Sequence, residues 1–380
     1  MSAAASDVER VSVAQDLEEL PEAQWQRLVQ GRPALRLEVL KAIASHATRP
    51  LSLRVFLLED GLGLAAAAIC EAVAAQAQYN PFDLLLFGRA APAVRRLGAS
   101  TQSLLVFQTP IARQSPVVVR TATAELQRRL FGRLLDHIEN HAAARGLGIA
   151  FVGITPEDQP AWSVLRARGY LASEFDSTAL LDIQWSDFDS YVRHQRRRSK
   201  SAARDARAER NRNRRGAVSI RPLRCTDDDM RALDLITREH YRRKNGRDPI
   251  HDPRFLRQLR DTLGEDLLVF EAVRNGARAA MLAVVRSGEV GWMAWIGVEQ
   301  RDRPNDFTYA NILFYEAADW APMLGLKTLI YGTAAQRSKA KRGCRLLALH
   351  LFYRPHRPLW RALARPYLAI HGLWYRRKVY

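Results

Sequence analysis

The sequence predicts an α/β protein built from two units of the same plan. In each half, segments with helical periodicity alternate with short apolar runs that are typical of strands. The order strand, glycine turn, Ala-rich strand also occurs twice, in residues 53–73 and in residues 267–287. We therefore expect an internal duplication in which each unit combines helices with a mixed sheet. The 380 residues, 47% of them hydrophobic, are enough to form two such cores.

The first half opens with a helical pattern at residues 34–46, which leads into the two strands of the repeat. A long helical segment at 122–148 ends on Gly146 and Gly148, and glycine is common at the C-terminus of a helix. The other expected elements are strands at 83–87, 103–109, 116–120, 149–154 and 177–183, and a short helix at 159–170.

The second half repeats this arrangement. Asn275-Gly276 between two apolar runs is the strongest short-range signal for a β-hairpin. Helices are expected at 227–244, 253–263 and 306–321, and strands at 266–273, 277–285, 290–298, 327–332 and 345–354. We accordingly expect an N-terminal domain at 1–190, a basic linking helix at 191–216, and a C-terminal domain at 217–380 with a basic tail.

The net charge of +18 arises entirely in the second half. Residues 191–380 hold 40 basic and 19 acidic side chains, whereas residues 1–190 hold 18 and 21. Residues 193–215 alone carry 11 basic and 2 acidic side chains, and residues 354–378 carry 7 basic and no acidic ones. This asymmetry predicts an anionic partner, whether nucleic acid, a phosphorylated ligand or acidic lipid.

Several classes of function lose their support. Cys70, Cys225 and Cys344 are widely separated, so neither a metal site nor a disulfide framework is expected, and a reduced compartment fits best. The sequence shows no signal peptide, no apolar run of the roughly 18 residues that a transmembrane segment needs, and no DNA-binding motif. Phosphate-loop, dinucleotide, metalloprotease and serine-hydrolase motifs are also missing. We expect a cytoplasmic protein, either free or peripheral at the inner membrane face.

The first candidate site follows the strand expected at 290–298. Residues 299–311 combine arginines with turn and capping residues at the start of a helix. Free N–H groups and the positive end of the helix dipole bind anions at such a position, while an ordinary capped helix with solvated arginines is the alternative. The residues expected to hold a phosphorylated donor are Arg301, Arg303, Asn305, Asp306 and Thr308.

The second candidate site is a basic loop between the strands at 327–332 and 345–354. Four cations beside small residues suit a phosphate or carboxylate of the substrate, although a solvated hairpin loop is the alternative. His350, on the strand that follows, could act as a general base or be a core residue whose hydrogen bonds are satisfied. The four cations are Arg337, Lys339, Lys341 and Arg342.

The third candidate site is the basic run at 193–215, which predicts one long polybasic helix that ends near Gly216. It would bind a polyanion such as tRNA or a lipid surface, chiefly through Arg196, Arg197, Arg198 and Lys200. The run contains no aromatic residue of the kind that RNA-binding motifs interleave with basic ones. A solvated helix that joins two domains is the competing interpretation.

Four segments resemble those of the tandem GNAT-fold acyltransferases related to the FemAB aminoacyltransferases and the CelD/BcsL-like acetyltransferases. The resemblance covers roughly residues 15–355. The segments are WSDFDSYVRHQRRRSKSAARDARAER at 185–210, SVLRARGYLAS at 163–173, FTYANILFYEAADWAPMLGLKTLIYG at 307–332 and KAKRGCRLLALHLFYR at 339–354.

The resemblance implies two GNAT-like units in which central parallel strands splay apart and admit a thioester or aminoacyl donor. It implies an acyltransferase that moves an acyl group from acyl-CoA to an amine or hydroxyl acceptor, in envelope polysaccharide or peptidoglycan-related metabolism. Tyr309, Tyr331 and His350 would supply polar groups near the transferred acyl carbon.

The sequence departs from the family pattern in one place, because the glycine-containing pyrophosphate loop of single-domain acetyl-CoA enzymes is replaced by EQRDRPND at 299–306. An aminoacyl-tRNA donor therefore stays open. A non-catalytic polyanion-binding protein is the hypothesis from another class.

Overall fold

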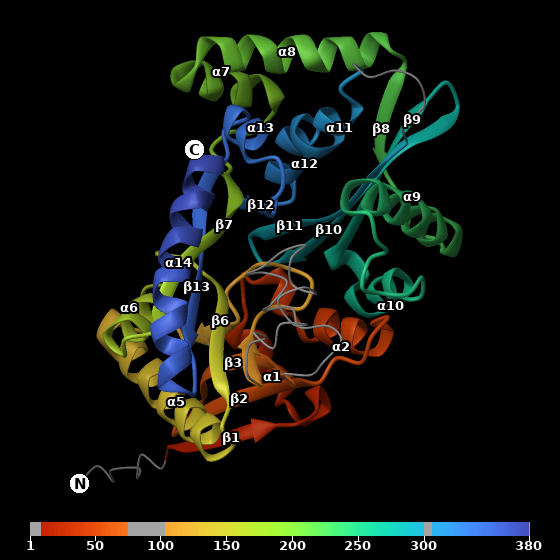
Figure 1. Ribbon diagram of the computed structural model, residues 1–380. Coiled ribbons are helices and arrows are strands. Elements are labelled where there is room, and N and C mark those ends of the chain that lie inside the picture. Colours follow the sequence, from red (N-terminus) through yellow and green to blue (C-terminus); the bar gives the residue numbers. More distant parts are fainter. Residues whose placement is uncertain (1–8, 75–102, 300–305, 380) are drawn as a thin grey trace, which may run out of the picture. The chain divides into compact units, whose positions relative to one another are not determined.

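The computed structural model describes residues 9–74, 103–299 and 306–379 (Figure 1). The chain forms two compact units that interleave along the sequence. The first comprises Met1–Val29, Leu51–Ser177 and Leu347–Tyr380, and the second comprises Gln30–Pro50 and Thr178–Leu346. These units differ from the contiguous halves expected from the sequence, because a segment from each half is exchanged. The division into domains at 1–190 and 217–380 stays a prediction.

The first unit contains a mixed sheet with the strand order β1-β2-β3-β4-β6-β13, and β5 pairs with β3. Its strands are β1 (Arg10–Ala14), β2 (Leu53–Asp60), β3 (Gly63–Val73), β4 (Leu104–Phe107), β5 (Val117–Val119), β6 (Gly148–Ile154), the first part of β7 (Leu171–Asp182) and most of β13 (Arg345–Arg354). Its helices are α1 (Glu22–Leu28), α5 (Ala124–Ala144), α6 (Gln159–Ala167) and α14 (Pro358–Val379), and Leu17–Glu19 is a 3-10 turn.

Helix α5 builds the core of the first unit. The Thr123 side chain accepts a hydrogen bond from the Leu126 N–H and caps the helix. Apolar residues at helical spacing, including Leu130, Leu134 and Ile138, are fully buried in a cluster with β2, β3 and β6. The expected helix at 122–148 is thus confirmed, with an earlier end. The strand expected at 83–87 lies outside the described residues.

The second unit has the strand order β7-β12-β11-β10-β9-β8. Its other strands are β8 (Val218–Pro222), β9 (Leu267–Arg274), β10 (Ala277–Ser287), β11 (Val290–Val298) and β12 (Thr328–Ile330). Its helices are α2 (Leu37–His46), α7 (Phe188–Arg198), α8 (Lys200–Arg215), α9 (Asp227–Asn245), α10 (Phe255–Leu263), α11 (Thr308–Ala310), α12 (Ala317–Met323) and α13 (Gln336–Lys341). Asn311–Tyr315 is a π-helical turn, and Pro33–Leu35 and Gly264–Asp266 are 3-10 turns.

The expected duplication appears in matching strand lengths. An eight-residue strand followed by an eleven-residue antiparallel strand occurs as β2 and β3 in the first unit and as β9 and β10 in the second. The second hairpin turns at Asn275 and Gly276, whose φ values of 49° and 77° belong to the turn that Asn-Gly favours. The predicted fold class, α/β with mixed sheets in both units, is confirmed.

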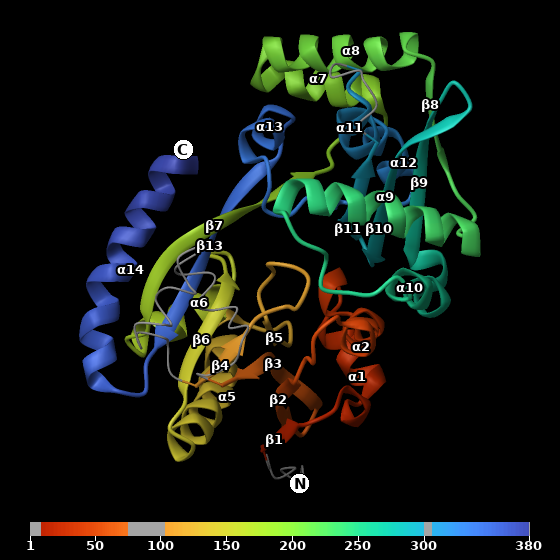
Figure 2. The ribbon, with the colours of Figure 1, turned by 45° about the vertical axis from the view of Figure 1, so that its right-hand side comes forward.

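The prediction of one long linking helix is wrong, because α7 and α8 are separate helices that lie side by side (Figures 1 and 2). Ser199 between them has an extended backbone, and its side chain accepts a hydrogen bond from the Ala202 N–H. Serine competes with the helix backbone in this way, so it ends one helix and caps the next.

Two further segments differ from expectation. Residues 336–341, expected as a loop, form the short helix α13, and its turn-out at Gly343 has φ of 92°, which favours glycine. The basic tail at 354–378 contains the 22-residue helix α14. Both segments are rich in Arg and Lys, so their charge masked the helical pattern in the sequence.

Candidate functional site

Strands β11 and β12 of the second unit pair only at their beginnings. Their parallel ladder consists of Val290–Thr328, Gly291–Leu329 and Trp292–Ile330, and it ends there because β12 stops at Ile330. The rest of β11 pairs with β10 alone among the described strands. Two parallel strands that part in this way are the geometry that the family resemblance implies at a donor site. The splayed end of β11, residues 293–298, is therefore the centre of the candidate site.

A β-bulge lies at the point where the two strands part. The register of β11 against β10 moves from Met293–Val284 to Trp295–Ala283, so Ala294 is the extra residue. A bulge leaves backbone groups outside the ladder and bends the strand. An unpaired N–H beside a splayed edge can donate a hydrogen bond to a carbonyl oxygen of a bound donor.

The first unit has a nine-residue loop at the equivalent position. Strand β3 pairs with β4 through residues 70–73 and with β5 through residues 66–68, and residues 108–116 connect the two strands. This loop lies against β6: a Cβ built on Gly153, whose φ is 90°, would be 3.0 Å from the Gln114 carbonyl oxygen. The parallel strands β4 and β6 also pair along the full length of β4. The splay is therefore a property of the second unit.

A helical stretch from Thr308 to Met323 begins near the end of β11. Phe307, before its first turn, has φ of 56°, a strained conformation for a residue with an aromatic side chain. Thr308 is buried, and its hydroxyl lies 3.1 Å from both the Asn213 amide nitrogen and an Arg274 guanidinium nitrogen. Asp306 forms an ion pair with Arg274 and accepts a hydrogen bond from the Thr308 N–H at 3.0 Å.

These contacts define the role of the predicted donor-binding residues. Asp306 and Thr308 fix the start of the helix through bonds within the protein. Their side chains hold the strained turn rather than reach outward. Arg301, Arg303 and Asn305 lie outside the described residues.

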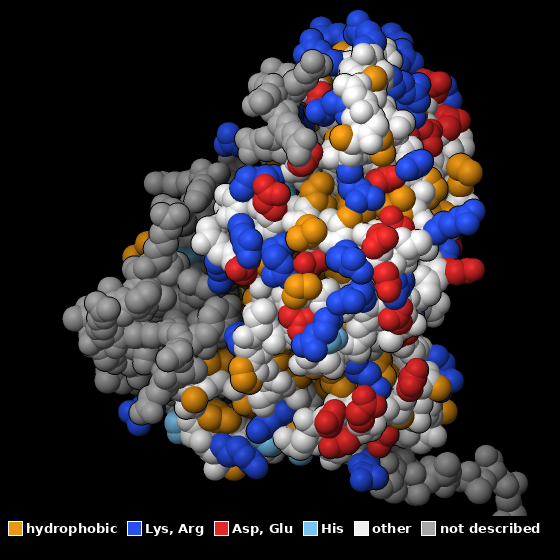
Figure 3. Space-filling view, turned by 90° about the vertical axis from the view of Figure 1, so that its right-hand side faces the viewer, with side chains coloured by type: hydrophobic (Ala, Val, Ile, Leu, Met, Phe, Trp, Pro, Cys, Tyr) orange, Lys and Arg blue, Asp and Glu red, His pale blue; other side chains and the backbone are white. Residues whose placement is uncertain are grey.

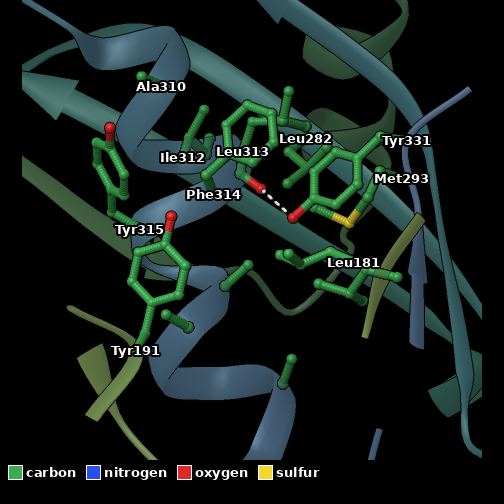
Figure 4. Close-up of a cluster of buried hydrophobic side chains, with 14 of the residues drawn as sticks. Leu181, Tyr191, Leu282, Met293, Ala310, Ile312, Leu313, Phe314, Tyr315 and Tyr331 are labelled. Carbon is green, nitrogen blue, oxygen red and sulfur yellow. Dashed lines mark hydrogen bonds between the residues drawn. The ribbon is translucent and has the colours of Figure 1, made fainter. Parts of the chain in front are cut away.

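Tyr331 is buried at the carboxyl end of β12 (Figure 4). Its hydroxyl donates a hydrogen bond of 3.1 Å to the Leu313 carbonyl oxygen, and its ring stacks on Phe314 with centroids 4.6 Å apart. Both partners belong to the π-helical turn, where the wider winding changes the ordinary pattern of helix hydrogen bonds. Burial raises the pKa of Tyr331 well above its usual value. Tyr331 therefore joins β12 to the helix of the candidate site as a neutral phenol.

Replacing Tyr331 with phenylalanine tests this structural role. The variant keeps the ring stacking and loses one buried hydrogen bond, so the free energy of unfolding should fall by about 1 kcal/mol. Chemical denaturation of the wild-type protein and the Tyr331→Phe variant measures this difference. A much larger loss of turnover with unchanged stability would instead place the hydroxyl at the reacting atoms.

Tyr309 contacts two side chains from the end of α9. Its ring is parallel to the His240 ring at a centroid distance of 6.3 Å, and the Lys244 ammonium lies 5.2 Å from the Tyr309 ring centroid. Helix α9 meets the splayed end of β11, because the Arg243 guanidinium donates to the Val298 carbonyl oxygen at 2.5 Å. Tyr309, His240 and Lys244 are thus polar groups beside the splayed strand.

Burial is the main cause of the pKa shifts in this cluster. It raises the pKa of Tyr309 and lowers that of Lys244. The pKa of His240 falls to about 4, through burial and then the positive charges of Lys244 and Arg243. His240 is neutral near pH 7, so its imidazole can accept a hydrogen bond. Sequence reasoning missed His240, since a lone histidine in a charged helix carries no pattern.

Stability should therefore depend on pH through His240. Its pKa is near 6.5 when unfolded and lower when folded, so only the unfolded state gains a proton as the pH falls from about 6.5 to about 4. The free energy of unfolding should decrease over this range by about 1–2 kcal/mol, a value reduced for partial exposure. Denaturation of His240→Phe at several pH values should show a shallower decrease than wild type. The exposed His356→Phe variant is the control, and equal slopes for both variants would contradict the assignment.

The predicted substrate-binding cations are mostly engaged within the second unit. The Lys339 ammonium is buried and donates to the carbonyl oxygens of Tyr331 and Gly332 at 2.6 and 3.0 Å. Lys341 forms an ion pair of 2.7 Å with Asp205. Arg337 is exposed.

Arg342 lies at the centre of a buried polar network. Its guanidinium forms an ion pair of 2.6 Å with Glu209, and its Nε donates to the Tyr315 hydroxyl at 3.1 Å. The Tyr315 hydroxyl donates in turn to Glu209. The Arg342 carbonyl oxygen accepts from the Tyr191 hydroxyl at 3.0 Å and from the Gln195 amide at 3.3 Å. Arg342 therefore joins α13 to α7 and α8.

His350 belongs to the first unit. It pairs with Ile154 of β6, and its ring meets the Trp162 ring edge-on with centroids 4.5 Å apart. Tyr309 and Tyr331 belong to the second unit. The structure thus places the three predicted catalytic residues in different units, and His350 packs within the side-chain core of the first.

The basic residues of α7 and α8 form an exposed surface. Arg196, Arg197 and Lys200 are exposed, and Arg198, also exposed, donates a hydrogen bond of 2.6 Å to the Gly343 carbonyl oxygen. Lys and Arg side chains gather at the top of Figure 3, where α8 lies. The opposite face of α8 is apolar, with Ala203 and Ala206 in the core of the second unit. The charge is therefore directed to solvent.

The comparisons with known proteins agree with this architecture. Residues 196–340 match a family described as acetyltransferase (GNAT) domain. Among curated proteins, no sequence matches this chain. FemX has a similar fold, with a TM-score of 0.58 at 10% identity over 93% of this chain and 99% of FemX.

Two further solved structures share the fold. One is the C-terminal domain of a putative lysylphosphatidylglycerol synthetase from Agrobacterium fabrum, with a TM-score of 0.56, 12% identity, and coverage of 92% of this chain and 94% of that one. The other is L-PGS from Bacillus licheniformis, with a TM-score of 0.52, 12% identity, and coverage of 90% and 98%. At these identities the likeness concerns the fold. The region that carries the splayed strands lies within the GNAT-domain match.

Within the described ranges, no group of three His, Cys, Asp or Glu residues could hold a metal ion. No helix in the described part of the chain is long and apolar enough to cross a membrane.

Proposed function

We propose that this protein is an acyltransferase in which the second unit binds an acyl donor at the splayed end of β11. The observation that carries the proposal is the parting of β11 and β12 after three residue pairs, within the GNAT-domain match. We also propose that each compact unit derives from one GNAT-like domain. The loop at residues 108–116 gives the first unit a structural or acceptor-binding role.

The reaction needs no covalent nucleophile on the protein. The acceptor nitrogen or oxygen attacks the donor carbonyl carbon, a new bond to that carbon forms, and the bond to the leaving sulfur or oxygen breaks while the acceptor loses a proton. Backbone N–H groups freed at the Ala294 bulge would stabilise the developing oxyanion. Neutral His240 and Tyr309 are the groups placed to orient the acceptor or its proton.

Acyl-CoA is the donor that fits a GNAT-type site. The positive end of the helix at residues 308–323 suits its pyrophosphate. The acceptor class that we propose is an amine or hydroxyl of an envelope sugar, peptide or lipid, supported by the fold shared with FemX and the lysylphosphatidylglycerol synthetase domain.

Aminoacyl-tRNA is the second candidate donor, favoured by the exposed basic surface of α7 and α8. Neutralising Arg196, Arg197 and Lys200 together should weaken binding of tRNA and reduce its dependence on salt. The matched control is Arg128→Gln with Arg129→Gln, two adjacent exposed arginines on α5. Equal weakening by both sets of changes would reject this surface as the contact.

The test of the proposed function is incubation of the purified protein with a panel of acyl-CoA thioesters and charged tRNAs, each with amine and hydroxyl acceptors. Mass spectrometry should detect acyl transfer from one donor class. Absence of transfer from every donor, together with tight binding to polyanions, would favour a non-catalytic binding protein.

A further inference from the structure

Helix α14 of the first unit has one face packed on its own unit and an opposite face that is apolar and exposed. Leu368 is buried, and its carbonyl oxygen accepts a hydrogen bond of 2.9 Å from the Ser173 hydroxyl. Gly372, one turn later, lies so close to β7 that a Cβ would be 3.2 Å from the Ser173 hydroxyl oxygen. The Tyr375 hydroxyl donates to Asp176 at 2.7 Å. These residues define the inner face, which runs alongside β7 (Figure 2).

The outer face of α14 exposes large apolar side chains. Ile370 is 67% exposed and Leu373 is 62% exposed, and both lie on the side opposite Leu368 because residues two and five positions apart on a helix diverge widely. Tyr367, at the border of the two faces, is 36% exposed. A helix whose inner face is already anchored keeps two aliphatic side chains in water only at a cost, so this face is suited to a partner.

The charge around this face identifies the partner. Residues 354–378 carry seven Arg and Lys residues and no Asp or Glu. Arg365 and Arg357 are exposed within this segment. An exposed apolar face flanked only by positive charge is typical of a helix that lies in the interface of an anionic bilayer. A protein partner would need no such uniform sign of charge.

We infer that α14 binds the surface of an anionic lipid membrane, with Ile370 and Leu373 inserted among the acyl chains and the surrounding arginines at the headgroups. The helix does not span the bilayer: its central Arg361 and Arg365 and its contacts to β7 hold it parallel to the surface. This binding is independent of the transfer chemistry proposed for the second unit, and it would bring the enzyme to an acceptor that is anchored in a membrane.

The test is co-sedimentation of the full-length protein with vesicles of phosphatidylcholine alone and of phosphatidylcholine mixed with phosphatidylglycerol. Wild-type protein should bind the anionic vesicles and be released by salt. The double variant Ile370→Ser, Leu373→Ser should bind about tenfold more weakly or less. Arg357→Gln with Arg365→Gln should also weaken binding by about tenfold, since each charge near the surface contributes about fivefold.

The matched control is Leu62→Ser, which removes an aliphatic side chain that is 84% exposed in the turn between β2 and β3 of the same unit. It should bind as wild type does. Far-ultraviolet circular dichroism and thermal melting establish that each variant is folded.

Three results would overturn the inference. They are absence of binding by the wild-type protein, equal binding by the Ile370→Ser, Leu373→Ser variant, and a dimer in solution that this variant dissociates. Loss of vesicle binding with acyl transfer retained on a soluble acceptor would separate this inference from the proposed function.

Discussion

The Arg342→Met variant is expected to lose about 3 kcal/mol of unfolding free energy, because it removes one partner of a buried ion pair. The side chains of Arg342 and Glu209 are only 12% and 13% exposed, and the Tyr315 hydroxyl bonds to both. Methionine keeps much of the volume of arginine but leaves the Glu209 carboxylate with a single strong donor. Urea denaturation of both proteins measures the difference.

A double-mutant cycle with Glu209→Gln isolates the pair. The two single changes together should cost less than their sum, since each removes the same interaction. Arg337→Met is the matched control on α13, and this exposed position should change stability by less than about 0.5 kcal/mol. A small stability effect for Arg342→Met combined with a large increase in KM would instead support the substrate-binding role first predicted for it.

Replacing Gly297 with alanine should displace α9 from the candidate site. The new Cβ would lie 2.5 Å from the carbonyl carbon and oxygen of Ile236 and 2.7 Å from the Thr237 nitrogen, all of them backbone atoms. Backbone in the middle of a 19-residue helix cannot yield locally, so we expect a loss of about 3 kcal/mol, at the upper end for overpacking. Denaturation and steady-state turnover measure the two consequences.

The Gly132→Ala variant is the control for this change. Gly132 lies within α5 with nothing within 4 Å of its added Cβ, so alanine there should stabilise the protein by up to about 1 kcal/mol. Turnover should fall in Gly297→Ala and stay unchanged in Gly132→Ala. Unchanged turnover in both folded variants would show that the position of α9 is irrelevant to transfer.

Much of the fold could be predicted from the sequence because apolar periodicity determines which segments are buried. The strands at 290–298 and 149–154 and the Asn275-Gly276 hairpin follow from local patterns alone. The exchange of residues 30–50 and 347–380 between the compact units could not be predicted. Which strand pairs with which depends on contacts between residues far apart in sequence, and no local propensity encodes them.

The site was harder to predict because charge alone does not reveal what a side chain contacts. Lys339, Lys341 and Arg342 form a uniform basic cluster in the sequence, yet one donates to carbonyl oxygens and two pair with carboxylates of α8. Thr308 was placed correctly at a helix start, but its hydroxyl turns inward. The Ala294 bulge leaves no trace in the sequence, since any small residue tolerates it.

The central claim is that the second unit binds the donor at the splayed end of β11, and hydrogen–deuterium exchange tests it most directly. The full-length protein would be measured with and without acetyl-CoA, or with the donor that supports transfer. The amides of residues 293–298 and 308–315 should exchange more slowly with donor bound, and those of residues 104–119 and 148–154 should not change. Protection confined to the first unit would contradict the account.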